Sequence, residues 1–330
     1  MVSGRKWAVA VLFIACAAMA GANLKQETAF EAGRHAYEAS DYVRAIQALQ
    51  TAAANDQQNG EVQLLLAKSY LELQEHDPAI KSAERAVAID GRNSVYHEWL
   101  GRAYGEKADH AGWFSAISLA KKTRKEFETA VQLDGKNYSA RQALIEFDCS
   151  APGLVGGGED KALPQIRQLA ELDAAEGHYA AGNCRRQKKD FATADAEFTK
   201  ALESDPKSAE LIYDIGDYAL KHNQPERMLA VADTGERVAP ADPRAKFYRG
   251  VALVLEKKNP EEAERLLDDY AKKAPMRSGY PRPAAAHAWL GRLFEDQNRI
   301  EDAAKELETA LKLDPKNKMA QETLKRLKKG

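Results

Sequence analysis

Small and large apolar residues recur in a fixed pattern about every 34 positions along most of this chain. The clearest copy is the segment AAAHAWLGRLFEDQNRIEDAAKELETALKLDPKN near the C-terminus. Small residues at Gly291 and Ala303 would let two antiparallel helices approach closely, while Phe294 and Leu307 would fill the seam between them. Pro315 would end the second helix. The pattern predicts a pair of helices, and there is no period-two alternation to indicate strands.

Eight copies of this pattern can be placed. Their shared marker positions are Gly33, Ala36, Ala45, Leu49 and Ala52; Leu66, Ala67, Tyr70, Ala79, Ala83 and Ala86; Leu100, Gly101, Tyr104, Phe127 and Ala130; Leu144, Ala162, Ile166 and Leu169; Gly182, Ala194, Phe198, Ala201 and Pro206; Gly216, Met228, Ala232 and Pro240; Gly250, Ala263, Leu267 and Pro275; and the C-terminal copy. The predicted segments are 26–93 (units one and two), 94–174 (irregular units three and four), 175–275 (units five to seven), a linker at 276–283, and 284–330 (unit eight and a cap helix).

The C-terminal copy matches the tetratricopeptide pattern residue by residue, at His287, Leu290, Gly291, Phe294, Ala303, Leu307, Ala310 and Pro315. The chain resembles tetratricopeptide repeat proteins over nearly its whole length after residue 22, weakly in units four, six and seven. The resemblance implies an all-α fold: a right-handed α-solenoid of about eight helix pairs with a concave groove. In such a solenoid each unit buries its apolar face on its neighbours.

A glycine-rich stretch, SAPGLVGGGED, interrupts unit four. Strand, glycine loop and helix is the arrangement of phosphate-binding loops, but no Gly-Lys-Ser/Thr follows Gly156, Gly157 and Gly158. Glu159 and Asp160 would occupy the first turn of the next helix and repel a phosphate. The stretch is therefore predicted to lengthen the turn between two helices by about five residues, and Pro152 to help stop the first of them.

Unit three carries about ten extra residues, within GEKADHAGWFSAISLAKKTRKEF. Trp113, Ile117, Ala120, Phe127 and Val131 fall at helical spacing, so the second helix is predicted to begin near Trp113 and to run about ten residues longer than usual. Either this stripe packs internally over the glycine-rich turn, or Trp113 and its neighbour Phe114 are exposed anchors for a partner. Both insertions are predicted to lie on one edge of the solenoid and to touch.

The groove of such a solenoid is lined mainly by the first helix of each pair. Arg34, Lys68 and Arg102 share one groove position, and Glu38, Glu72 and Glu106 follow four residues later. Two interpretations remain: solvated intrahelical pairs, or a groove that binds a peptide by its charges. A second groove position could supply apolar contacts, through Phe30, Leu64, Tyr179, Tyr213 and Phe247. Phe30 and Leu64 stand where a carboxylate clamp would need Lys or Asn.

The first 22 residues differ from the rest. Arg5 and Lys6 precede an apolar stretch that is short for a membrane span, and small residues near Ala20 fit a signal-peptidase site. We interpret 1–22 as a secretory signal; a lipoprotein signal acylated at Cys16 is the less favoured alternative and would be the one source of membrane attachment. The expected location is periplasmic or secreted. Of the three cysteines, Cys149 and Cys184 lie beyond this segment, and the sequence leaves open whether they pair.

The net charge and the motifs of the sequence limit the classes of function that we expect. The net charge of −2 becomes −4 without the signal, which gives no reason to expect nucleic acid. No Gly-x-Ser-x-Gly, His-Glu-x-x-His or metal-ligand spacing of the seven histidines is present, so no catalytic residue, metal, cofactor or small-molecule substrate is predicted. The sequence predicts a non-catalytic, exported scaffold that binds a protein or peptide in its groove. The alternative is a structural or assembly subunit of a cell-envelope complex that makes contact through the insertion edge.

Overall fold

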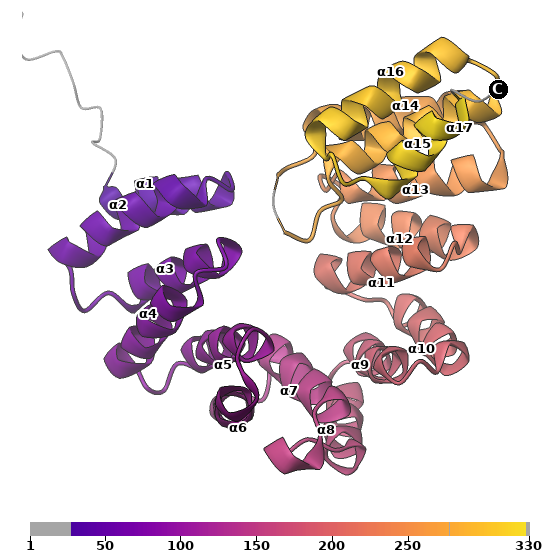
Figure 1. Ribbon diagram of the computed structural model, residues 1–330. Helices are drawn as coiled ribbons and strands as arrows, with labels where there is room; N and C mark the ends of the chain where they lie inside the picture. The colour runs from indigo at the N-terminus through magenta and orange to yellow at the C-terminus, as the bar shows by residue number, and fades with distance from the viewer. Residues whose placement is uncertain (1–27, 277, 328–330) are drawn as a thin grey trace, which may run out of the picture.

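The computed structural model describes residues 28–276 and 278–327, and within them it contains helices and no strand. Within these residues, seventeen α-helices follow one another as eight antiparallel pairs and a final single helix (Figure 1). The pairs are α1 (Ala29–Glu38) with α2 (Tyr42–Asn55), α3 (Gly60–Glu72) with α4 (His76–Ile89), α5 (Ser94–Asp109) with α6 (Trp113–Leu133), α7 (Tyr138–Ser150) with α8 (Glu159–Leu172), α9 (Ala174–Gln187) with α10 (Phe191–Glu203), α11 (Ala209–Lys221) with α12 (Pro225–Val238), α13 (Arg244–Glu256) with α14 (Pro260–Lys273), and α15 (Pro283–Asp296) with α16 (Ile300–Leu313). The last helix is α17 (Lys318–Leu327). The predicted all-α fold of eight pairs and a cap helix is confirmed.

Polar side chains begin the first helix of several pairs. The side-chain oxygens of Asn59, Asn93 and Asn137 accept hydrogen bonds from the backbone N–H groups of Val62, Val95 and Ala140. Such an N-cap satisfies a donor that the helix itself leaves free and is worth about 1 kcal/mol. These caps mark where units two, three and four begin, whereas α13 and α15 begin without a side-chain cap.

The seam inside each pair depends on the small residue of the repeat. A Cβ atom at Gly101 would lie 2.6 Å from a ring carbon of Phe127, and one at Gly182 would lie 2.6 Å from the ring of Phe198. Glycine therefore allows the first helix to rest directly on the large side chain of the second. Phe127 and Phe198 are both buried, as the repeat pattern predicts.

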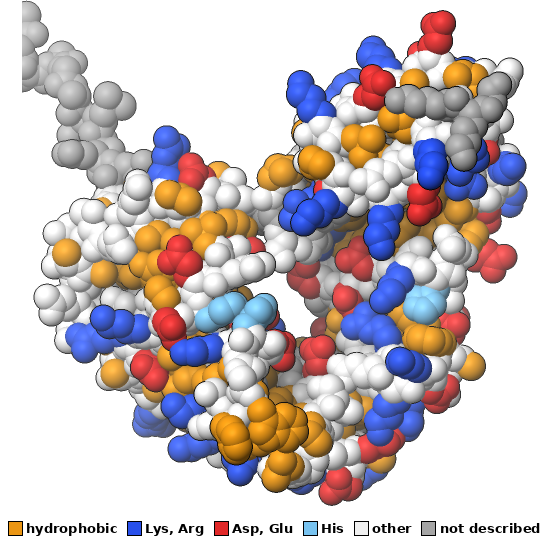
Figure 2. Space-filling model, in the orientation of Figure 1, with side chains coloured by type: hydrophobic (Ala, Val, Ile, Leu, Met, Phe, Trp, Pro, Cys, Tyr) orange, Lys and Arg blue, Asp and Glu red, His pale blue; other side chains and the backbone are white. Residues whose placement is uncertain are grey.

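The stacked pairs curve into an open ring around a central hollow (Figures 1 and 2). Helices α1 to α4 face α13 to α17 across the opening, and α5 to α9 form the base of the ring in this view. Of the helices in the described part of the chain, none is both long and apolar enough to span a membrane.

The insertion in unit three extends both helices of the pair. Helix α6 begins at Trp113, as predicted, but it has 21 residues, against 14 in α4, so it is seven residues longer and not ten. Helix α5 takes up the remainder, since it has 16 residues where α3 has 13. The extra residues lengthen both helices. No Pro occurs between residues 94 and 133 to end either helix early.

The glycine-rich insertion forms the turn between α7 and α8. This turn spans residues 151–158, where the turn between α3 and α4 spans 73–75, so the predicted lengthening by five residues is confirmed. It includes a short 3-10 helix, η1 (Gly153–Val155). Gly156 has φ +100° and Gly158 has φ +147°, values that side chains rarely adopt. A Cβ at Gly157 would lie 2.1 Å from the carbonyl oxygen of Ala151. The role of Gly156, Gly157 and Gly158 is therefore to allow the backbone conformation of this turn.

Candidate functional site

A cavity of about 460 Å³ opens on the concave surface of the ring. Its wall is made by the first helices of successive pairs, α5, α7, α9, α11 and α13, together with Gly279 of the linker. The side chains that line it include Arg102, Tyr138, Ser139, Gln142, Glu146, Glu176, Tyr179, Asn183, Glu210, Asp214, Asp217 and Arg244. Figure 2 shows Asp and Glu side chains gathered on the wall of the central hollow. The cavity spans about five repeats, which suits an extended chain better than a compact molecule.

The cationic groove position predicted from the sequence continues beyond Arg102 with a change of sign. Arg34, Lys68 and Arg102 each follow the small residue of the first helix, at Gly33, Ala67 and Gly101. In the next three units the same position holds Glu146, Asn183 and Asp217. These three residues line the cavity, as Arg102 does. We call the six residues the groove ladder: Arg34, Lys68, Arg102, Glu146, Asn183 and Asp217.

Sequence reasoning missed the acidic half of the groove ladder. The insertions in units three and four shift the repeat spacing, which is 34 residues from Arg34 to Lys68 but 44 from Arg102 to Glu146. A search at a fixed spacing of 34 therefore loses the position after Arg102. Asn183 and Asp217 directly follow Gly182 and Gly216, which was an available signal, but in unit four Ile145 replaces the small residue before Glu146.

The predicted pairs between each cation and the glutamate four residues later form in one of three cases. Arg34 donates to Glu38 at 3.2 Å, as the solvated-pair interpretation expects. Arg102 instead reaches back to Glu98 at 3.0 Å and donates to Ser139 of the next unit, also at 3.0 Å.

The third cation, Lys68, lies over an aromatic ring. Its ammonium is 4.5 Å from the ring centre of Trp99, and the guanidinium of Arg102 lies 5.5 Å from the same ring. Trp99 was not predicted, and its position three residues before Arg102 on the same helix was the available signal. Burial lowers the pKa of the Lys68 ammonium.

The residues predicted at the apolar groove position differ in how accessible they are. Tyr179 is half-buried and lines the cavity, where its hydroxyl donates to Asp214 at 3.0 Å. Phe30 and Leu64 are also half-buried but do not line the cavity. Tyr213 and Phe247 are 1% and 0% exposed, so these two predictions are wrong: in the tightly stacked C-terminal units this position belongs to the core.

Three carboxylates in the cavity accept hydrogen bonds from neutral donors. Glu146 accepts from the amide of Gln187 at 3.3 Å, and Glu176 accepts from that of Gln142 at 3.0 Å. Asp217 accepts from the hydroxyl of Tyr248 at 2.7 Å.

In the described part of the chain, none of Glu146, Glu176 and Asp217 forms a salt bridge within 4.0 Å, so the hydrogen bonds hold their geometry without neutralising their charge. Burial raises the pKa of the Glu176 and Asp217 carboxyls. The charged forms of these two groups therefore lack full compensation.

Arg244 ties the linker to the rim of the cavity. Its side chain is buried between the rings of Tyr213 and Tyr280, 4.2 Å from each centre. It donates to Glu210 at 2.8 Å, to Asp242 at 2.7 Å and to the carbonyl oxygen of Gly279 at 3.1 Å. The linker therefore has a fixed position against α13.

The insertion edge is held by contacts that the sequence did not reveal. Arg124 of α6 donates to Asp148 of α7 at 2.8 Å, and a Cβ at Gly156 would lie 3.0 Å from Arg124 Cδ. The two insertions therefore touch, as predicted.

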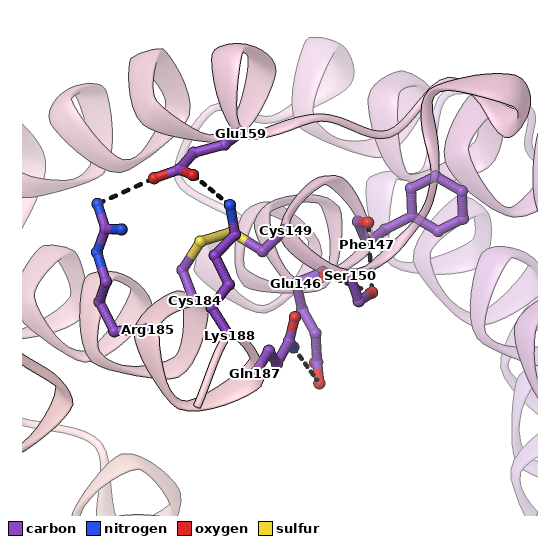
Figure 3. Close-up of a disulfide and its surroundings, with 9 residues drawn as sticks. All are labelled: Glu146, Phe147, Cys149, Ser150, Glu159, Cys184, Arg185, Gln187 and Lys188. Carbon is purple, nitrogen blue, oxygen red and sulfur yellow. Dashed lines mark hydrogen bonds and ion pairs between the residues drawn. A yellow bond between two sulfur atoms is a disulfide. The ribbon is translucent and has the colours of Figure 1, made fainter. Parts of the chain in front are cut away.

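On the other side, Glu159 at the start of α8 bonds to Lys188 and lies 2.9 Å from Arg185 of α9 (Figure 3). Its carboxylate thus binds two cations of the chain itself, which supplies a structural role for the acidic first turn of α8.

Cys149 and Cys184 form a disulfide, which settles the pairing that the sequence left open. Their Cα atoms are 5.4 Å apart, and the bond joins α7 to α9 beneath Glu159 (Figure 3). It closes a segment that contains the glycine-rich turn and α8. The least regular unit of the solenoid is thus cross-linked to the regular unit that follows it.

The aromatic residues at the start of α6 are exposed. Trp113 is 70% exposed and Phe114 is 87% exposed, and Leu154 of η1 is 61% exposed. The internal-packing interpretation is therefore wrong for Trp113 and Phe114, although Phe127 of the same stripe is buried. Figure 2 shows hydrophobic side chains gathered at the lower edge of the view, where Figure 1 places α6 and α8.

No group of three or more His, Cys, Asp or Glu that could hold a metal ion occurs within residues 28–276 and 278–327. Two of the histidines, His97 and His178, meet carboxylates across the seam of their helix pairs. His97 lies 2.6 Å from Glu126, and His178 lies 2.7 Å from Glu197.

The fold and the concave cavity define a helical repeat protein of the solenoid class. Family models described as tetratricopeptide repeat match residues 36–102, 175–208, 213–278 and 255–318, which together cover more than half of the chain. The chain belongs to the tetratricopeptide repeat family. Tetratricopeptide repeat proteins are generally protein-interaction scaffolds that bind proteins or peptides. A comparison with curated proteins gave no match.

Solved structures with a similar arrangement include a chain of the APC/C hetero-tetramer Cut9-Hcn1, with 15% identity over 89% of this chain and 54% of that chain and a TM-score of 0.49. This chain thus spans about half the length of that one. A thermophilic tetratricopeptide protein of Thermus thermophilus, TTC0263, shows 17% identity over 68% of this chain and 97% of its own, with a TM-score of 0.44. YrrB, whose structure is described as having an unusual peptide-binding site, shows 18% identity over 75% of this chain and all of its own, with a TM-score of 0.38.

Proposed function

We propose that this protein is an exported, non-catalytic scaffold that binds an extended segment of a protein partner on its concave surface. The observation that carries the proposal is the cavity of about 460 Å³, whose wall is built from five successive first helices. Its lining combines apolar surface, such as the rings of Tyr138 and Tyr179, with polar groups that can meet a peptide backbone. The family supports a scaffold role, since its members are generally interaction modules.

Export is part of the proposal. The predicted signal, residues 1–22 with its alternative acylation site at Cys16, lies outside the described residues. The disulfide between Cys149 and Cys184 supports an oxidising compartment, because cytosolic reductants keep most thiols reduced. Fractionation of cells that express the chain with and without residues 1–22 tests this. Recovery of both forms in the cytosol, with Cys149 and Cys184 open to alkylation, would refute export.

The groove is tested by capture of partners from an envelope extract. One variant carries Ser139→Trp and Gln142→Trp, which place bulky side chains in the cavity whatever the charge of its occupant. A matched variant carries Trp113→Ala and Phe114→Ala. If the partner uses the groove, the first variant loses capture and the second retains it. The reverse result would show that the groove is not the binding surface. Circular dichroism of both variants checks that the helices are intact.

The insertion edge favours a second candidate, a structural or assembly subunit of a cell-envelope complex. Trp113, Phe114 and Leu154 expose apolar surface on one side of the ring, around the turn that contains Gly156, Gly157 and Gly158. Exposed aromatic residues are typical anchors of protein interfaces. Loss of capture by the Trp113→Ala and Phe114→Ala variant alone would support this second candidate.

A further inference from the structure

The groove ladder changes sign in the middle of the ring. Its first three residues, Arg34, Lys68 and Arg102, are cations, while Glu146 and Asp217 occupy the same position in units four and six. The cavity lies on the acidic side of this change, since it is lined by five carboxylates and by two guanidinium groups. The guanidinium groups of Arg102 and Arg244 already pair with Glu98 and with Asp242 and Glu210. Glu210 and Asp214 are paired as well, with Arg244 and Arg186. The charge that remains for a ligand is therefore the negative charge of Glu146, Glu176 and Asp217.

The geometry assigns a cationic ligand to this cavity: we propose that it binds the Lys or Arg side chains of an extended basic peptide segment of a partner. The proposal rests on the proposed function, a groove that binds a peptide, and adds the chemistry of the occupant. Glu146, Glu176 and Asp217 carry the recognition, because neutral donors orient them and leave their charge available. An arriving ammonium or guanidinium can form charge-assisted hydrogen bonds with them.

Two further observations fit a cationic hydrogen-bond donor. The side-chain oxygen of Asn183, on the groove ladder between Glu146 and Asp217, is buried and has no hydrogen-bond partner within the described residues. A buried acceptor without a donor is costly, and a ligand N–H would relieve that cost. Tyr138 and Tyr179 also line the cavity and offer apolar surface for the long methylene stem of a lysine or arginine.

The spacing of the carboxylates favours an extended segment over a free cation. Glu146, Glu176 and Asp217 stand on α7, α9 and α11, so they belong to three successive repeats. No described group gathers three such ligands around one point. A chain that crosses the repeats can present one basic side chain to each carboxylate, which a single small cation cannot do.

The test is a selection of displayed random ten-residue peptides against the intact protein, followed by anisotropy measurements on the selected peptides. The variant combines Glu146→Gln and Asp217→Asn, whose amide oxygens preserve the hydrogen bonds from Gln187 and Tyr248. The matched control combines Glu171→Gln and Glu308→Gln, two exposed glutamates on second helices, and has the same net charge.

We expect the selected peptides to be enriched in Lys and Arg. The double groove variant should bind them roughly five- to thirtyfold more weakly, and the control should stay within about twofold, since two partly exposed ion pairs are lost in one case and none in the other. Binding should also weaken as salt is added.

Selected peptides that are acidic or neutral, and that the groove variant binds as well as the wild type does, would overturn the cationic assignment while leaving groove binding intact. Basic peptides that lose equal affinity for the control variant would overturn it as well, because the attraction would then belong to the whole molecule. The absence of any selected peptide would count against both the assignment and the proposed function.

Discussion

Opening the Cys149–Cys184 disulfide should loosen the middle of the solenoid and leave its ends unchanged. The bond joins residues 35 positions apart and encloses the turn at 151–158 and α8. In the chain-entropy account, closing a loop of this length lowers the conformational entropy of the unfolded segment, which stabilises the folded state by about 4 kcal/mol at 25 °C. In a repeat solenoid each unit contacts its neighbours only, so this loss falls on α7 to α9.

The assay is amide hydrogen exchange, followed by mass spectrometry, on the oxidised protein, on the reduced protein and on a Cys149→Ala, Cys184→Ala variant. A loss of about 4 kcal/mol in local opening corresponds to nearly a thousandfold faster exchange in α8 and α9. Exchange in α15 and α16 serves as the internal control and should be unchanged. Reduction should have no further effect on the alanine variant.

Two results would refute this reasoning. Equal exchange in α7 to α9 before and after reduction would mean that packing alone holds unit four. Faster exchange along the whole chain would mean that the solenoid opens as one cooperative body, so the nearest-neighbour description of its stability would be wrong.

Three further predictions concern stability. Gly157→Ala should lower the free energy of unfolding by about 2 kcal/mol, because the new methyl group would overlap the Ala151 carbonyl oxygen; Gly153→Ala, with nothing within 4 Å of its Cβ, is the matched control in urea unfolding and should change it little. Arg244→Lys should speed proteolysis of the linker, because an ammonium cannot fill the space between two rings and also donate to three acceptors. Loss of this buried pairing should lower the free energy of unfolding by about 3 kcal/mol. An unchanged rate of linker cleavage would contradict this role of Arg244. Burial raises the pKa of Tyr218 to about 12, whereas an unfolded tyrosine ionises at pH ~10, so the contribution of Tyr218 to stability should be complete below pH ~10 and be lost between pH ~10 and ~12; Tyr218→Phe should reduce the fall in the free energy of unfolding over this range, and an unchanged fall would contradict the prediction.

The repeat alone determined the fold of this chain. Small residues such as Gly101 and Gly182 recur at the one position where a first helix meets a large side chain, and this requirement is local and periodic. The start of α6 at Trp113 and the length of the turn at 151–158 were predictable for the same reason, since each is a departure from a known period.

Only the tertiary structure decided which residues face the groove and which are covered. Tyr179 and Tyr213 share one repeat position, yet the first lines the cavity and the second is buried, because the stacking of neighbouring units differs along the ring. The pairing of Cys149 with Cys184 depends on a distance between two helices that spacing in the sequence does not set. The acidic cavity is also tertiary: Glu146, Glu176 and Asp217 are ordinary surface residues in the sequence, and only the curvature of the solenoid brings their charges onto one wall.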